Sequence, residues 1–210
     1  QGKLPGSIQK WRTDLAKEFD FRDAVVENLS APELEQLQRE HVINWLISNH
    51  DAHGKQFLRL KDGQVKGIDL GQLFKFLGDD HLSIDYHPNK AFGEQEPFFN
   101  TVMRAWRDRR IEMDLQATYK YISRFESITY DAYTELLKPY AERRFNGKPL
   151  KLKQFYETAL IRKNDLRKDF EEFYTELLRK RSKDKKIVFR FDLDGKELPV
   201  GKDVKGFKHI

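Results

Sequence analysis

Five polar side chains near residue 50 have the types and the spacing that phosphoryl chemistry uses. Asp51, His53, Lys55 and Gln56 lie close together, and Asp69 follows thirteen residues after Gln56. Phosphoryl transfer requires a carboxylate near the attacking hydroxyl, a second carboxylate for the Mg²⁺ that bridges the phosphates, and a further oxygen ligand for the metal. Two aspartates and an amide side chain supply that set, provided that the fold brings them together.

The sequence between these side chains predicts a β-hairpin. Two apolar runs, residues 56–60 and 65–69, flank an Asp-Gly dipeptide, which is typical of tight hairpin turns. Because a hairpin folds the chain back on itself, Asp51 and Asp69 are expected to lie close in space although they are eighteen residues apart.

With these residues in view, the segments Asp-Ala-His-Gly-Lys-Gln at 51–56 and Ile-Asp-Leu-Gly at 68–71 resemble the D-x-H-x-x-N … I-D-x-G pattern of the atypical kinases. These are the phosphatidylinositol 3-/4-kinase-like and HipA-like branch of the protein-kinase fold. The apolar segment 42–49 is similar to the helix that leads into their catalytic loop, so the resemblance covers roughly residues 5–75. It implies a kinase-like C-lobe.

The resemblance also implies a role for each of the five side chains. Asp51 would orient or deprotonate the acceptor, and His53 would face the transferring phosphate. Asp69 would bind Mg²⁺ or Mn²⁺, and Gln56 would be a second metal ligand and part of the nucleotide site. Gln56 stands where the family has Asn, which moves its amide oxygen by about 1.5 Å, one C–C bond. Lys55 is placed with the ATP-binding residues, although a solvated lysine is its simpler interpretation.

Two departures from the family concern the other lobe. The family binds ATP between two lobes with a glycine-rich loop and a strand lysine. Neither a G-x-G-x-x-G motif nor a V-A-I-K-like strand precedes Asp51. The expectation is therefore a C-lobe whose N-lobe is not in this chain and is contributed by upstream sequence or by a second chain.

The function that this resemblance implies is an ATP- and Mg²⁺-dependent kinase, with transfer of AMP as a variant of the same chemistry. A protein hydroxyl or an inositol lipid would be the acceptor. An inactive pseudokinase or a basic helical interaction module is the alternative, and an anionic lipid or inositol phosphate would then be the partner. The basic residues of such a module fall in predicted helical segments and in one run, Arg179–Lys186. Those in the helical segments are Arg104, Arg107, Arg109, Arg110, Arg143 and Arg144.

A third interpretation is a metal phosphohydrolase of the HD type. His50-Asp51 and the following Gly54-Lys55 are similar to an H-D-x-G-K motif with one residue inserted. That site also needs an upstream histidine on the metal. His41 is expected instead to be a core histidine with its hydrogen bonds satisfied, and His50 to be a loop residue that supports the site.

Composition limits these options further. The sequence has 39 Lys and Arg against 34 Asp and Glu, a net charge of +5, and no cysteine. The mixed charge disfavours a sequence-specific nucleic-acid partner, and the lack of cysteine excludes disulfides, thiolate catalysis and Cys-ligated zinc. No apolar run approaches the roughly 18–20 residues of a membrane span. A cytoplasmic location is expected, bacterial or, for a secreted effector, in the host cytosol.

Periodicity and turn signals predict a mostly α fold with a minor β component. A capping box, Ser-Ala-Pro-Glu at 30–33, begins a helix expected to run to residue 48. The other predicted elements are helices at 8–19, 97–109, 115–126, 129–145 and 150–181, and a terminal hairpin of 187–191 with 197–200. Residues 1–150 are expected to form the C-lobe, and residues 151–210 a helical extension with the terminal hairpin.

Overall fold

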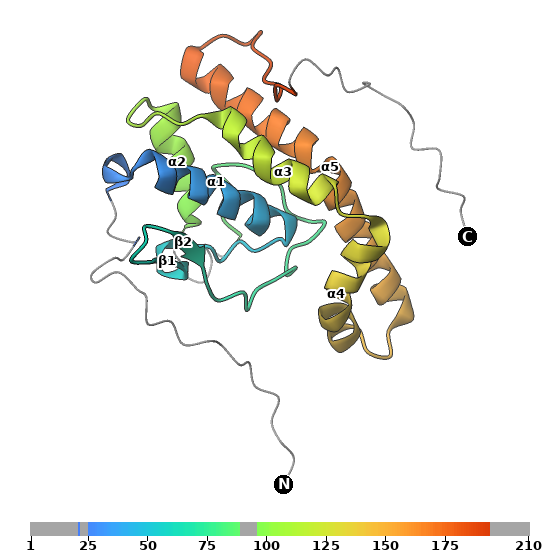
Figure 1. Ribbon diagram of the computed structural model, residues 1–210. Helices are drawn as coiled ribbons and strands as arrows, with labels where there is room; N and C mark the ends of the chain where they lie inside the picture. Colours follow the sequence, from blue (N-terminus) through green and yellow to red (C-terminus); the bar gives the residue numbers. More distant parts are fainter. Residues whose placement is uncertain (1–20, 22–24, 89–95, 194–210) are drawn as a thin grey trace.

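The computed structural model describes residues 21, 25–88 and 96–193, and this part of the chain is mostly helical (Figure 1). The predicted helix at 8–19 lies outside these residues. The predicted class, mostly α with a minor β component, is confirmed. The elements in chain order are α1 Ala31–Leu46, β1 Phe57–Arg59, β2 Val65–Gly67, α2 Phe98–Arg107, α3 Tyr119–Glu126, α4 Tyr130–Arg144 and α5 Pro149–Ser182.

The first helix, α1, has well-defined signals at both ends. At its start, the Glu33 carboxylate accepts hydrogen bonds from the backbone N–H of Ser30 at 2.9 Å and from its hydroxyl at 2.7 Å. At its end, Ser48 adopts a left-handed φ of 49°. The Asn49 N–H then donates to the Asn44 carbonyl at 2.8 Å, so the chain leaves α1 in a Schellman turn. That turn directs the following loop.

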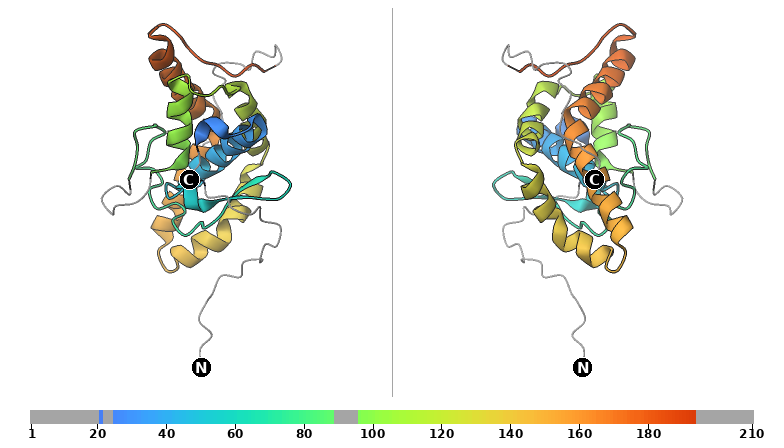
Figure 2. Two further views of the ribbon diagram at one scale, coloured as in Figure 1. Left: turned by 90° about the vertical axis from the view of Figure 1, so that its left-hand side faces the viewer. Right: turned by 90° about the vertical axis from the view of Figure 1, so that its right-hand side faces the viewer.

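The long helix α5 forms the back of the core. Figure 2 shows it running along the whole helical body. Its residues Leu166, Phe170 and Tyr174 are fully buried in one cluster with Leu37 of α1 and Met103 of α2. The domain boundary predicted at residue 150 falls in the first turn of α5. The C-terminal helix and the loop-bearing α1 therefore share one hydrophobic core.

The predicted hairpin is present. Strand β1 pairs with β2 in antiparallel register, with Phe57 opposite Gly67 and Arg59 opposite Val65. The Ile68 N–H donates to the Gln56 carbonyl at 2.7 Å, which extends the pairing to the residue beside Asp69. The hairpin docks on α1 because the Arg39 guanidinium donates to the Val65 carbonyl at 2.7 Å.

The histidine of α1 lies in the core, as predicted, but with an unsatisfied nitrogen. His41 stacks on Phe99 with ring centroids 4.7 Å apart and meets the edges of Phe170 and Phe173. Among the described residues its Nδ1 has no hydrogen-bond partner. Burial, with a smaller contribution from His50, lowers the pKa of His41 to about 3. The imidazole is therefore neutral, and the sequence had predicted a fully hydrogen-bonded ring.

The predicted terminal hairpin is not seen in the described residues. Residues 187–191 form no strand there, and residues 197–200 lie outside the described part. The Phe189 N–H donates to the Thr175 hydroxyl of α5 at 2.8 Å, and the Phe189 ring packs on Tyr174 with centroids 5.3 Å apart. Residues 187–191 thus form an extended segment that packs on α5. None of the described helices is apolar over enough residues to span a membrane.

Candidate active site

The loop that follows α1 carries Asp51 and is anchored at successive residues. The Asn49 side chain donates to the Asn44 side chain at 2.6 Å and accepts from the Asp51 N–H at 3.3 Å. The Ala52 carbonyl accepts from the Phe98 N–H at the start of α2, at 2.8 Å. The backbone on both sides of Asp51 is therefore fixed to helices.

The two side chains predicted to act on the acceptor and on the phosphate lie together. Nε2 of His53 is 3.8 Å from Oδ1 of Asp51. Nδ1 of His53 accepts a hydrogen bond from the Lys55 N–H at 3.2 Å, which leaves the proton of a neutral ring on Nε2, the side that faces Asp51. The other oxygen of Asp51, Oδ2, accepts from the Gln72 side chain at 3.1 Å. Gln72 follows the Ile-Asp-Leu-Gly segment, so this bond ties that segment to the loop.

Asp69 lies where the hairpin returns toward the loop. Its backbone is left-handed, with a φ of 53°, and its Oδ1 accepts from the Gly71 N–H at 3.1 Å. The residue is exposed, as are its neighbours Ile68 at 37% and Leu70 at 49%. Asp69 therefore presents a carboxylate at the surface, on a segment that the Gln72 contact connects to Asp51.

The remaining predicted site residues differ in their environment. Gln56 is buried, its N–H donates to the His53 carbonyl at 2.8 Å, and it lies in a 3₁₀ turn, Gly54–Gln56, which places its backbone between the loop and the hairpin. Lys55 is exposed. Within the described part of the chain, no group of three or more His, Cys, Asp or Glu side chains is arranged to hold a metal ion.

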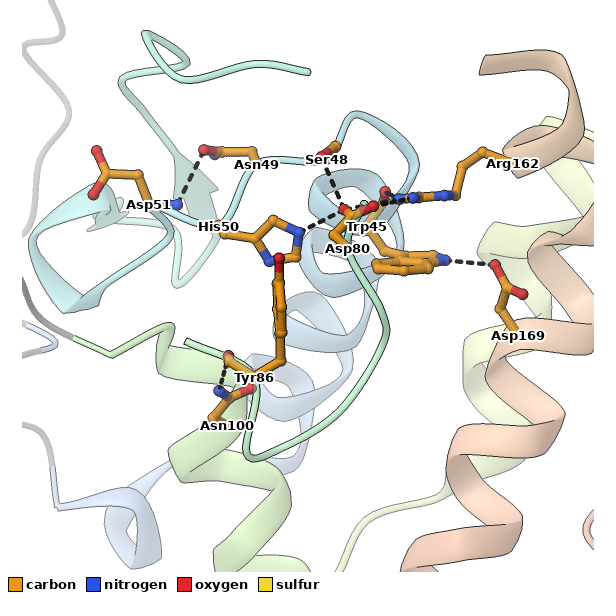
Figure 3. Close-up of polar contacts among 10 residues, drawn as sticks. All are labelled: Trp45, Ser48, Asn49, His50, Asp51, Asp80, Tyr86, Asn100, Arg162 and Asp169. Atoms are coloured by element: carbon orange, nitrogen blue, oxygen red, sulfur yellow. Dashed lines mark hydrogen bonds and ion pairs between the residues drawn. The ribbon is translucent and has the colours of Figure 1, made fainter. Parts of the chain in front are cut away.

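Behind the loop, a buried carboxylate collects three donors. Asp80 accepts from the Ser48 hydroxyl at 2.8 Å, from Nε2 of His50 at 2.6 Å and from the Arg162 guanidinium through two nitrogens. In Figure 3 these side chains converge on Asp80, whereas Asp51 points away from them. The Asp80 side chain has no exposed surface. Burial alone would raise its pKa, but the three donors and the Arg162 charge outweigh burial and lower the pKa to about 2.

Arg162 connects this cluster to α5 and to the end of α1. Its guanidinium lies over the Trp45 ring, 3.7 Å from the centroid, and donates to the Trp45 carbonyl at 2.8 Å. The Trp45 indole N–H donates to Asp169 at 2.8 Å, and the pKa of Asp169 is raised, chiefly by burial. His50, the residue before Asp51, is thus held through Asp80 by Arg162 of α5, which is 112 residues later in the sequence.

Sequence reasoning had assigned His50 a supporting role in the loop, and its contact with Asp80 fits that role. It missed Asp80, Arg162 and Gln72. Asp80 and Arg162 lie 30 and 112 residues from His50, and no local motif marks either of them. Gln72 stands directly after the Ile-Asp-Leu-Gly segment, and that position was a signal that could have identified it.

No family model, curated protein or solved structure matches this chain. The resemblance to atypical kinases is therefore an expectation from the sequence of residues 51–56 and 68–71.

Proposed function

We propose that this chain supplies the catalytic and metal-binding half of an ATP- and Mg²⁺-dependent phosphotransferase, which transfers a phosphoryl group to a hydroxyl. The observation that carries the proposal is the hydrogen bond from Gln72 to Asp51. It joins the loop of the D-x-H residues to the segment of the I-D-x-G residues, the two segments on which such a reaction depends.

On the acceptor side, Asp51 is the residue placed to orient the hydroxyl and take its proton. Gln72 fixes one carboxylate oxygen, and the second oxygen lies on the His53 side. Because positioning supplies most of the rate in phosphoryl transfer, a loop whose backbone is held at Asn49 and Ala52 suits this role. The Nε2–H of His53 is the donor available to a phosphoryl oxygen beside Asp51.

On the nucleotide side, the residues present fit a hard divalent cation. Mg²⁺ binds proteins through one or two carboxylates and keeps other positions for water and phosphate oxygens. Asp69 offers an exposed carboxylate whose Oδ1 is oriented by Gly71, and Gln56 is the amide proposed as its companion. A bound Mg²⁺ would neutralise charge on the phosphates of ATP. Lys55 is exposed and lies in the same 3₁₀ turn as Gln56.

The surroundings of Asp69 favour a partner lobe over this half of the site. Ile68 and Leu70 flank the carboxylate and expose apolar side chains, at 37% and 49%. A lobe packed over this half of the site would cover both side chains. We propose that this lobe is the N-lobe, from upstream sequence or a second chain, and that it holds the adenine and the α- and β-phosphates.

The test is an ATP turnover assay with Mg²⁺ on this chain alone and on the chain joined to its native upstream residues. Formation of ADP by the longer protein supports a kinase, and formation of AMP with a labelled protein supports adenylylation. Formation of neither contradicts the proposal and leaves the pseudokinase or interaction module. Equal turnover in both proteins contradicts the need for a second lobe.

Three variants of the longer protein assign the residues. Asp69→Ala should weaken Mg²⁺-ATP binding, whereas Asp51→Asn should leave binding intact and lower turnover. Asp131→Asn, in the first turn of α4, is the matched control for loss of one carboxylate charge and should change neither. If Asp51→Asn and Asp69→Ala both turn over ATP like the unmodified protein, the proposed roles are wrong.

A further inference from the structure

A cavity of about 840 Å³ lies between residues 71–79 and the helices α4 and α5, apart from the candidate active site. Asp51, His53, Gln56 and Asp69 are not among its lining residues. Its lining instead combines aromatic with basic side chains, among them Phe74, Tyr140, Phe145, Phe155, Arg144 and Lys151. Neither the sequence motifs nor the proposed function accounts for this combination.

Four aromatic residues form one wall of the cavity and contact one another. The Phe74 ring lies 5.0 Å from the Tyr140 ring and 5.1 Å from the Phe155 ring, between centroids. Phe155 also lies 5.6 Å from Tyr140 and 5.3 Å from Phe145. Phe155 is buried, whereas the other three residues are half-buried, so part of each of these three rings stays open. Open aromatic rings of this kind stack on the planar ring of a ligand.

The segment that carries Phe74 is held against both helices. The Tyr140 hydroxyl of α4 donates to the Leu73 carbonyl at 3.1 Å. At the other end of the segment, Gly78 has a φ of +94°, and a Cβ at this position would lie 3.1 Å from the Thr158 side chain of α5. A larger residue there would be strained in its backbone and would press on the helix. The wall of the cavity is therefore fixed by the fold itself.

Two cations lie together where the chain turns from α4 into α5. Arg144 is the last residue of α4, and Lys151 lies in the first turn of α5, which holds no acidic residue. Among the described residues, no carboxylate forms an ion pair with either side chain. Asp79 is the one acidic residue in the lining of the cavity within the described chain. The end of the cavity at the turn therefore suits an anionic group such as a phosphate.

The spacing along the two helices places each cation one turn from a ring. Tyr140 and Arg144 are four residues apart on α4, and Lys151 and Phe155 are four residues apart on α5. Residues at this spacing share a helix face, about 5–6 Å apart between Cβ atoms. Because the Tyr140 and Phe155 rings contact each other, the two rings lie together and the two cations lie together toward the turn. The cavity thus matches a ligand with a planar ring at one end and an anionic group at the other.

An amide side chain adds hydrogen-bonding groups to the same lining. Gln154 lines the cavity, and its backbone carbonyl accepts from the Thr158 hydroxyl at 2.9 Å. Within the described part of the chain, its side-chain amide has no hydrogen-bond partner. An amide offers both a donor and an acceptor, which is the combination that the edge of a nucleobase also presents. A nucleobase is therefore the planar ring that this lining suits.

We propose that this cavity binds a nucleoside monophosphate, with its base on the half-buried rings of Phe74 and Tyr140 and its phosphate at Arg144 and Lys151. The volume falls in the range of small-molecule sites, about 300–1,000 Å³. The site is separate from the residues proposed to bind Mg²⁺-ATP, and it does not depend on the proposed function. Because the two cations contact the phosphate directly, binding requires no divalent cation.

Binding is measured by calorimetry on the 210-residue chain in the presence of EDTA, with AMP as the probe. Ribose 5-phosphate lacks the base and adenosine lacks the phosphate, so each should bind at least about tenfold more weakly than AMP. Absence of AMP binding at about 1 mM overturns the site. An affinity for ribose 5-phosphate or for adenosine equal to that for AMP also overturns it, because the rings or the cations would then contribute nothing.

A pair of double variants tests the cations. Arg144→Gln with Lys151→Gln should lose about tenfold or more in affinity for AMP, because both phosphate-binding cations are gone. The matched control is Arg143→Gln with Lys153→Gln, which removes the same charge from the same two helices at residues that do not line the cavity. The control should stay within about twofold of the unmodified chain. An equal loss in both double variants would show general attraction by a basic surface and overturn the site.

Single variants test the aromatic wall and the location of the probe. Tyr140→Leu should weaken AMP binding about tenfold and leave ribose 5-phosphate unchanged, whereas Tyr140→Phe keeps the ring and should stay within about twofold for AMP. If Tyr140→Leu does not fold, the comparison of AMP with ribose 5-phosphate on the unmodified chain still decides the role of the rings. Asp69→Ala should leave AMP binding unchanged. A loss of AMP binding in Asp69→Ala would place the probe at the residues proposed for Mg²⁺-ATP and overturn the cavity site.

Discussion

The loop around Asp51 and the segment around Asp69 are both parts of one candidate site, but the fold supports them differently. The Asp51 loop is fixed by Asn49, by Ala52 and, through His50, by a buried carboxylate that α5 holds from behind. The Asp69 segment is exposed, and its neighbour Ile68 pairs with the backbone of Gln56. The Asp51 loop, proposed to act on the acceptor, is thus held by several contacts, whereas the Asp69 segment, proposed to bind the nucleotide, lies at the surface.

The difference follows from what each side would have to do. A general base must be held in place before substrate arrives, because small displacements lose much of the rate. A metal-binding carboxylate can be ordered by the metal, the nucleotide and a covering lobe. Loss of the Asp51 or the Asp69 side chain should therefore affect activity, whereas loss of the groups behind the loop should affect stability.

The largest effect is expected for Asp51→Asn in the protein joined to its upstream residues. Asn keeps the size of the side chain but does not accept the hydroxyl proton, so turnover should fall by about 10²–10⁴. The unfolding midpoint should change little, because Asn49 and Ala52 fix the loop backbone without the Asp51 carboxylate. A fall in turnover of less than about tenfold would contradict the assignment of Asp51 as the base.

The second-largest effect is expected for the buried ion pair of Asp80 and Arg162 behind the Asp51 loop. Asp80→Ala leaves Arg162 buried without its carboxylate, and breaking a buried ion pair from one side costs about 3–5 kcal/mol. Urea denaturation of the 210-residue chain measures the free energy of unfolding. The matched control is Glu135→Ala, which breaks an exposed ion pair with Lys138 and should change the free energy of unfolding far less than Asp80→Ala does. Similar losses in the two variants would show that the Asp80 cluster does not anchor the loop.

The same contrast separates what the sequence could predict from what it could not. The helix α1 and the hairpin were predictable because their signals are local: the Ser30–Glu33 capping box, the apolar period and the Asp-Gly turn. Asp51 and His53 were found as neighbours for the same reason. In the structure, Nε2 of His53 lies 3.8 Å from Oδ1 of Asp51.

Asp80 and Arg162 could not be predicted, because they act across the chain. Asp80 lies in an irregular stretch whose sequence gives no period, and Arg162 is one of many basic residues on α5. Pairing the two depends on how α5 packs against Trp45, a contact that no local pattern encodes. The left-handed residues Ser48, Asp69 and Phe74 were equally invisible, because none of them is glycine.

A smaller effect is expected in the pH dependence of the free energy of unfolding, from His41 of α1. His41 has its pKa lowered from 6.5 to about 3 by burial, so between these values the unfolded chain binds a proton that the folded chain does not. Stability should therefore rise with pH over this range and fall as the solution is acidified. From pH 7 to pH 5 this single group should remove about 2 kcal/mol from the free energy of unfolding.

His41→Leu is the variant that isolates this effect. Leucine does not titrate and suits the aromatic surroundings, so the variant should lose about 2 kcal/mol less than the unmodified chain between pH 7 and pH 5. Urea denaturation at the two pH values gives the comparison, with the exposed His81→Leu as the control. An unchanged pH dependence in His41→Leu would mean that the imidazole is not buried in its neutral form.

The smallest effect on stability is expected on the exposed side, from Asp69→Asn. Asn tolerates the left-handed φ of 53° and its amide oxygen can accept the same hydrogen bond from the Gly71 N–H, so the free energy of unfolding should change by less than about 0.5 kcal/mol. Asp69→Ala loses that hydrogen bond while the backbone keeps its left-handed conformation, and should cost about 0.5–1.5 kcal/mol. In the longer protein, Asp69→Asn should nevertheless weaken Mg²⁺-ATP binding, because the metal loses its carboxylate. A stability loss above about 2 kcal/mol in Asp69→Asn would place Asp69 among the anchored residues and remove the contrast with Asp80.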